Sequence, residues 1–131
     1  MTTNQIANRL VELCRKGEFE TAQKELFAEN AMSVEPQAGG GFEKETKGLK
    51  AIIEKGKQWN NMVESMKKLE VSEPMVASNS FACTMHMDVT MKNKEHWDMT
   101  ELCTYQVKDG KIVSQSDYYD ALGFYKQLGL M

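Results

Sequence analysis

Hydrophobic residues in the first half of the chain recur every three to four positions, which is the spacing of one side of a helix. This spacing predicts a helix that ends at Gly17, a second over about residues 18–28 and a third over about residues 48–66. Residues 32–35 are expected to form a short strand, because the proline that follows favours an extended backbone before it. Residues 36–48 are predicted to be a glycine-rich, charged loop. The buried side of the third helix is expected to comprise Leu49, Ile52, Ile53, Trp59, Met62, Val63 and Met66.

The second half of the chain alternates between apolar and polar residues from Leu69 onward, as half-buried strands do. The odd-numbered positions are apolar in residues 81–91 and, except at one glutamate, in residues 97–107. The Asp-Gly pair within Lys108–Gly110 predicts a tight hairpin, whose second strand would cover residues 111–120. Helical segments followed by a run of strands indicate the α+β class. We expect a cone-shaped, curved antiparallel or mixed sheet wrapped over three N-terminal helical segments.

The length and the charge limit the classes of function. A chain of 131 residues fits a single domain over 1–131. A net charge of −3 gives a phosphate backbone little to bind, so we expect no nucleic-acid partner. No apolar run approaches the roughly 20 residues of a membrane helix, and the first residues lack the apolar region of a signal peptide. We therefore expect a cytoplasmic protein without membrane contact.

The cysteines and histidines argue against a metal site. Cys14, Cys83 and Cys103 lie far apart and form no Cys-x-x-Cys pair. Each falls in an apolar pattern, so we interpret them as small buried residues in a reducing compartment. His86 and His96 stand in no recognisable metal-ligand set. No metal and no cofactor are expected.

Three motifs near the end of the chain resemble a known family. They are Asp109–Val113, Tyr118–Asp120 and Gln127–Gly129. Together they resemble the closing signature of SnoaL-like proteins, in which a hairpin leads into a last strand that ends near an aspartate. The resemblance implies the nuclear transport factor 2-like fold, a cystatin-like α+β barrel, over essentially the whole chain. That superfamily holds cyclases, isomerases, hydrolases and accessory binding domains, so the resemblance implies no particular activity.

Glu101 is the charged residue in the otherwise apolar row of residues 97–107. Burying an unpaired carboxylate costs free energy, so its pKa should rise or the group should gain a hydrogen-bond donor. A carboxyl group of this kind is a candidate general acid or base. The alternative is that Glu101 lies at a sheet edge, or bonds structurally to a buried hydroxyl or amide.

The resemblance implies a second acid–base group at Asp117. SnoaL-like cyclases and limonene epoxide hydrolase place a cavity aspartate three residues before the closing aspartate, which is Asp120 here. Asp117 would share a strand face with Val113, Gln115 and Tyr119. The family often has tryptophan at the position of Gln115, and this departure argues against the hydrolase activity. The alternative is that Asp117 is solvated on an edge strand. Asp120 is expected to have a closing structural role, in which it caps a helix.

These residues suggest an acid–base enzyme, of the isomerase, cyclase or hydrolase type, that acts on a small apolar or amphipathic molecule. Gln115 and Tyr119 would donate hydrogen bonds to a developing oxyanion. Ser33 and Glu35 lie on the strand where relatives place polar cavity groups, so they would contact the substrate unless that strand end is exposed. The apolar wall is expected to consist of Met85, Met87, Trp97 and Tyr105. The alternative is a non-catalytic binding or dimerisation module whose cavity is filled by methionines.

The outer face of the sheet suggests how the chain assembles. Thr84, His86, Asp88 and Thr90 alternate with the apolar row and are expected on that face. Relatives with this fold commonly pair through their sheets, and closed two-fold pairing is the commonest form of oligomer. We therefore expect a homodimer that forms through the sheet.

Overall fold

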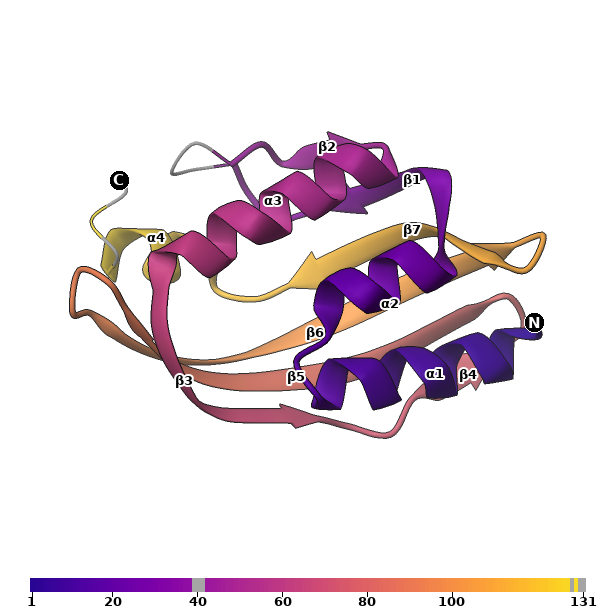
Figure 1. Ribbon diagram of the computed structural model, residues 1–131, viewed down its shortest axis with the longest axis horizontal. Helices are drawn as coiled ribbons and strands as arrows, with labels where there is room; N and C mark the ends of the chain where they lie inside the picture. The colour runs from indigo at the N-terminus through magenta and orange to yellow at the C-terminus, as the bar shows by residue number, and fades with distance from the viewer. Residues whose placement is uncertain (39–41, 128, 130–131) are drawn as a thin grey trace.

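The computed structural model describes residues 1–38, 42–127 and 129, and Figure 1 shows helices packed along a curved sheet. The helices are α1 (Thr3–Arg15), α2 (Phe19–Leu26), α3 (Leu49–Met62) and α4 (Ala121–Gln127). The strands are β1 (Phe27–Val34), β2 (Glu45–Lys47), β3 (Val63–Val71), β4 (Met75–Ala77), β5 (Ser80–Met91), β6 (His96–Lys108) and β7 (Lys111–Tyr118). Residues 39–41, which belong to the predicted loop, lie outside the described part. None of the described helices is long and apolar enough to cross a membrane.

All the strands belong to one mixed sheet. Its order is β2-β1-β7-β6-β5-β3, and β4 pairs with β5. β1 and β7 run parallel to each other, while the other paired neighbours are antiparallel. α1 packs against β3, β4 and β5 toward one edge of the sheet, whereas α3 packs against β1 and β2 toward the opposite edge (Figure 1). The α+β class and the curved mixed sheet are therefore confirmed, and the helices cover the sheet's inner face.

α1 has well-defined signals at both of its ends. At its start, the Thr2 hydroxyl accepts from the Gln5 backbone N–H at 3.2 Å, and the Gln5 side chain accepts from the Thr2 backbone N–H at 2.9 Å. This reciprocal capping box satisfies donors that a helix otherwise leaves free. At its end, Gly17 takes a positive φ of 74°, a conformation that favours glycine. The predicted end of the first helix is confirmed.

The third helix is shorter than its apolar spacing predicted. Residues 63–66 continue that spacing, but α3 ends at Met62 and β3 begins at Val63. Met66, expected on the buried side, is 37% exposed and pairs with Val89 of β5. Pairing with a long strand outweighs helix propensities, which differ by less than about 1 kcal/mol per ordinary residue.

Two further boundaries differ from the sequence prediction. α2 ends at Leu26 rather than near residue 28, and β1 starts there at Phe27, well before the predicted strand at 32–35. Leu26 and Phe27 are both buried apolar residues, and they fit the pattern of a helix as well as that of a strand. The spacing of apolar residues therefore did not locate the boundary between α2 and β1. The predicted loop also contains the short strand β2, which pairs with the end of β1.

A bulge in β7 decides which of its side chains face inward. Val107 pairs with Ile112, but its neighbour Gln106 pairs with Ser114, so Val113 is the extra residue. Ile112 is therefore fully buried while Val113 is only half-buried, contrary to the prediction that Val113 shares a face with Asp117. Beyond the bulge the alternation is regular and Asp117 faces the inside.

Asp120 caps α4, as the sequence suggested. Its side-chain Oδ1 accepts from the Gly123 backbone N–H at 3.0 Å, and its carbonyl accepts from Phe124 at 3.0 Å. A Cβ atom on Gly123 would lie 2.3 Å from the other carboxylate oxygen of Asp120. Glycine at 123 therefore makes room for this cap.

The cap gives a stability prediction. Asp120→Ala should lower the free energy of unfolding by about 1 kcal/mol, because it removes the side-chain acceptor. Asp120→Asn should retain most of the stability, and Gly123→Ala should reduce it by pushing the carboxylate away. Urea denaturation followed by circular dichroism measures all three. An unchanged midpoint for Asp120→Ala would show that the cap does not contribute.

Candidate functional site

A cavity of about 220 Å³ lies between the inner face of the sheet and the helices. β5, β6 and β7 supply one wall, and α1, α2, α3 and α4 close the others. Most of the wall is apolar, and Met85, Met87 and Tyr105 line it as the sequence analysis expected. One set of polar groups gathers toward β6, β7 and the end of β1: Ser33, Glu35, Lys55, Glu101, Gln115, Asp117 and Tyr119. A second set comes from α2 and α3 and consists of Glu20, Gln23, Lys57 and Asn60.

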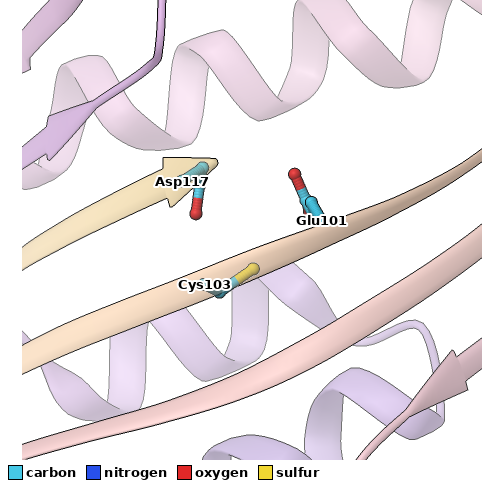
Figure 2. Close-up of side chains that lie close together, drawn as sticks. All are labelled: Glu101, Cys103 and Asp117. Atoms are coloured by element: carbon cyan, nitrogen blue, oxygen red, sulfur yellow. The ribbon is translucent and has the colours of Figure 1, made fainter. Parts of the chain in front are cut away.

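The polar side centres on two carboxyl groups and a thiol. Cys103 is the direct cross-strand partner of Asp117, and Glu101 lies on the same face of β6 as Cys103. Figure 2 shows Glu101 and Cys103 on β6 and Asp117 at the end of β7, with the thiol below the two carboxyl groups. A ligand atom from each of the three side chains lies within 4.8 Å of the other two.

Neither carboxyl group lies on an edge strand. β6 is flanked by β5 and β7, and β7 is flanked by β1 and β6, so the edge alternatives for Glu101 and Asp117 are wrong. Asp117 is only 7% exposed, whereas Glu101 is partly accessible because it faces the cavity. The structure thus places both candidate acid–base groups on the inner wall.

Burial raises the pKa of both carboxyl groups. Burial, the negative charge of Asp117 and that of Glu35 raise the pKa of Glu101 well above its ordinary value. Burial and the charge of Glu35 raise the pKa of Asp117 to about 7, although hydrogen bonds from Gln115 and Cys103 oppose the shift. Near neutral pH, Asp117 therefore exchanges its proton, and its negative charge makes the proton of Glu101 harder to remove.

Gln115 holds the carboxylate of Asp117. Its side-chain Nε2 donates to Asp117 Oδ1 at 3.0 Å and approaches Oδ2 at 3.3 Å. The two residues are separated by one position on β7 and face the same side. Gln115 therefore favours the ionised form of Asp117 and fixes the direction of its carboxylate.

A second polar network lies beside the first and contains a residue that the sequence analysis missed. Lys55 of α3 donates from Nζ to Ser33 Oγ at 3.1 Å and to Glu35 Oε1 at 3.2 Å. Tyr119 donates from its hydroxyl to Glu35 Oε2 at 3.0 Å. Glu35 is thus held between an ammonium group and a phenol, with its side chain only 13% exposed. Lysines on a mainly polar helix usually face water, so nothing in the sequence distinguished Lys55 from its neighbours.

Trp97 does not lie where the sequence analysis expected it. It is absent from the described residues that line the cavity, and its ring packs on Phe124 of α4 with centroids 5.0 Å apart. Trp59 of α3 lines the cavity and contacts the same phenylalanine at 5.6 Å. Alternation along β6 predicted the correct face for Trp97, but its position near the strand's start puts it beyond the cavity.

The thiols are poorly suited to nucleophilic chemistry. Cys14, Cys83 and Cys103 are free and buried, as expected. Burial raises the pKa of Cys14 to about 12 and that of Cys83 to about 11, so both are protonated at neutral pH. Burial also raises the pKa of Cys103 well above its ordinary value. A metal ion at Glu101, Cys103 and Asp117 would have to displace several protons.

The fold and this cavity can now be compared with known proteins. A family model for the SnoaL-like domain matches residues 1–119. The chain belongs to the SnoaL-like domain family. A search of curated protein sequences found no match.

Solved structures agree with membership of the SnoaL-like family. A proposed SnoaL-like polyketide cyclase from Mesorhizobium loti, also labelled carbohydrate phosphatase, is 30% identical and superposes with a TM-score of 0.84 over 91% of this chain and 100% of that chain. A nuclear transport factor 2-like protein of unknown function from Burkholderia pseudomallei is 15% identical, with a TM-score of 0.79 over 97% and 98%. A proposed isomerase from Bacillus subtilis is 20% identical, with a TM-score of 0.73 over 98% and 96%. The last two are similar in fold alone.

The raised pKa values predict how stability depends on pH. As the pH rises above the ordinary pKa values of these groups, the folded SnoaL-like domain retains protons on Glu101 and Asp117 that the unfolded chain has released, and for Asp117 this holds up to about pH 7. The free energy of unfolding should therefore fall as the pH rises, by at most about 1.4 kcal/mol per pH unit for each retained proton.

Denaturation curves at pH 5, 6, 7 and 8 test this expectation. Glu101→Gln and Asp117→Asn should each flatten the fall, because neither amide titrates. Glu29→Gln is the matched control: it removes an exposed carboxylate from β1, and it should leave the fall unchanged. If the free energy of unfolding fell equally steeply with pH in all four proteins, Glu101 and Asp117 would not retain protons in the folded state.

Proposed function

We propose that this SnoaL-like domain is an enzyme that moves a proton on a small, apolar or amphipathic substrate by general acid–base catalysis. One observation carries the proposal: two carboxyl groups with raised pKa values share one wall of a mainly apolar cavity, and the charge of Asp117 further raises the pKa of Glu101. Groups whose surroundings separate their proton affinities can act as acid and base at the same pH. A cavity filled by methionines would have favoured a binding module, and here about 220 Å³ remains open.

Asp117 is the proposed base. Its pKa of about 7 matches the range in which a base is both available and strong enough at neutral pH. Gln115 fixes its orientation, as described above, and apolar walls keep water from competing for the proton. The proposed reaction is removal of a proton from a carbon next to a carbonyl group, which gives an enolate.

Glu101 is the proposed acid. Its protonated carboxyl group can donate a hydrogen bond, or its proton, to the oxygen on which the enolate charge develops. This assignment replaces Gln115 and Tyr119 as oxyanion donors, because their donor groups are bonded to Asp117 and Glu35. In this proposal Gln115 and Tyr119 position the acidic groups. Lys55 neutralises Glu35 and so limits the negative charge next to Asp117.

The comparisons support this class of reaction without naming a substrate. The solved structure with 30% identity is described as a proposed SnoaL-like polyketide cyclase, and an aldol-type cyclisation passes through an enolate. The cavity of this chain is mainly apolar, with its carboxyl pair on one wall. We therefore propose ketones with an apolar body as the first compounds to examine.

Exchange of hydrogen for deuterium tests the proton transfer without a known product. The protein, in deuterated water at pH 7, is incubated with cyclohexanone, α-tetralone and phenylacetone, and loss of the α-proton signals is followed by NMR. Exchange above the buffer rate is expected for at least one ketone. Asp117→Asn should reduce that exchange by about a hundredfold or more, since a general base typically contributes 10²–10⁴.

The control separates catalysis from a nonspecific effect of carboxylates. Asp98→Asn, on the outer side of β6, should exchange at the wild-type rate. Glu101→Gln should lower the rate less than Asp117→Asn, because an amide still donates a hydrogen bond. If none of the ketones exchanges faster than in buffer, or if Asp117→Asn exchanges at the wild-type rate, the proposed roles are wrong.

We also propose that two copies pair through the outer faces of their sheets. Leu102 and Tyr118 are direct cross-strand partners on that face and are 42% and 57% exposed. Thr84 lies opposite Leu102 on β5, which extends the same row. Exposed apolar pairs on a sheet face are a common basis for a self-complementary two-fold interface.

Light scattering tests this assembly. Wild-type protein at micromolar concentration should have twice the mass of the chain, and Leu102→Lys should shift it to the monomer by placing a charge in the interface. Leu122→Lys is the matched control, because Leu122 on α4 is 41% exposed but lies outside the sheet. A monomeric wild-type protein would contradict the proposed dimer.

A further inference from the structure

The charges that face the cavity are unevenly distributed. Glu20, Glu35, Glu101 and Asp117 line it, against Lys55 and Lys57. Lys55 is bonded to Glu35, and Glu20 is paired with Lys24. Within the described part of the chain, no lysine, arginine or histidine forms an ion pair with Glu101 or Asp117. The two central carboxyl groups therefore lack a cationic partner.

Aromatic rings surround the same space. Trp59, Tyr119 and Phe124 form a cluster in which Phe124 contacts the other two, with centroids 5.6 Å and 6.2 Å apart. All three line the cavity, and so does Tyr105 on the far side of Glu101 along β6. The faces of aromatic rings attract cations, most strongly where water is excluded. Rings and carboxyl groups together are the usual surroundings of a bound ammonium group.

We infer that the cavity selects a small organic cation, an apolar molecule that carries an ammonium group and places it between the Glu101–Asp117 pair and the aromatic wall. This inference rests on the pocket of the proposed function and names the class of molecule that enters it. The ammonium group supplies the positive charge that no ion pair gives to Glu101 and Asp117 within the described part of the chain, and its alkyl substituents contact the aromatic rings.

Other ligand charges fit the cavity less well. An anion would meet two carboxyl groups and could use Lys55 only by breaking its contact with Glu35. The other lysine of the lining, Lys57, is exposed to solvent and interacts with Glu20. Mg²⁺ and Ca²⁺ need about six oxygen ligands, but Glu101 and Asp117 stand beside a thiol in a mainly apolar wall. An organic cation needs no such set of ligands, because apolar contacts hold most of its surface.

The inference predicts a dependence on pH. Asp117 is faced by Glu101 and Cys103 from β6, by Glu35 just after β1 and by Lys55 from α3. With its pKa near 7, Asp117 is mostly protonated at pH 6 and mostly ionised at pH 8. A fixed cation binds the ionised form, so its Kd should fall about tenfold from pH 6 to pH 8. A neutral molecule of the same shape should show no such fall.

NMR titration of the full chain tests these expectations with three probes of similar shape. The probes are choline, its uncharged carbon isostere neohexyl alcohol, and the anion tert-butylacetate. At pH 8, choline should bind at least about tenfold more tightly than the alcohol, a difference of about 1.4 kcal/mol. The anion should bind most weakly. Asp117→Asn should remove the pH dependence for choline, whereas Asp98→Asn should keep it.

Several results would overturn the inference. They are equal or tighter binding of the alcohol, tightest binding of the anion, and a response to MgCl₂ or ZnCl₂ alone with none to choline. The wild-type titrations at two pH values decide the matter even if Asp117→Asn fails to fold. The ketone exchange assay is independent: exchange without a preference for choline refutes only this inference, and a preference without exchange refutes only the proposed catalysis.

Discussion

Two carboxyl groups on one inner face of a sheet cannot both be ionised cheaply once most water is removed. Glu101 and Asp117 are in that position, and much of their surroundings responds to it. Gln115 and the Cys103 thiol donate to the pair, which moderates the rise in pKa. Lys55 compensates Glu35, the third carboxylate nearby. These opposing electrostatic effects leave Asp117 with a pKa of about 7 and Glu101 with a pKa well above its ordinary value.

The backbone makes this arrangement possible through one irregular residue. The extra residue at Val113 shifts the alternation of β7, so that Ile112 before the bulge and Asp117 after it both face inward. Without the bulge, an odd separation of five positions would place the two side chains on opposite faces. Regular pairing of Leu102 with Tyr118 then fixes the outer face. A single insertion thus serves both the core and the site.

The sequence predicted what depends on local pattern and missed what depends on long-range packing. Glu101 was identifiable because one charge interrupts an apolar alternation, and the resemblance to SnoaL-like proteins pointed to Asp117. Trp97 was assigned to the cavity because alternation indicates a face but not how far along the strand the cavity extends. Lys55 was missed because its role depends on Glu35, which follows β1 and lies 20 residues earlier in the sequence. The ends of the second and third helices were misplaced for a similar reason, since sheet pairing decided them.

The short closing helix has a consequence for how this protein can change over evolutionary time. α4 contributes Phe124 and Tyr125 to the cavity, yet it is joined to the sheet at a single capped turn. Substitutions in these few residues can reshape one wall while the carboxyl pair and the strand register stay intact. Divergence among descendants of this sequence should therefore accumulate first in what the molecule accepts, and only later in the chemistry that it performs.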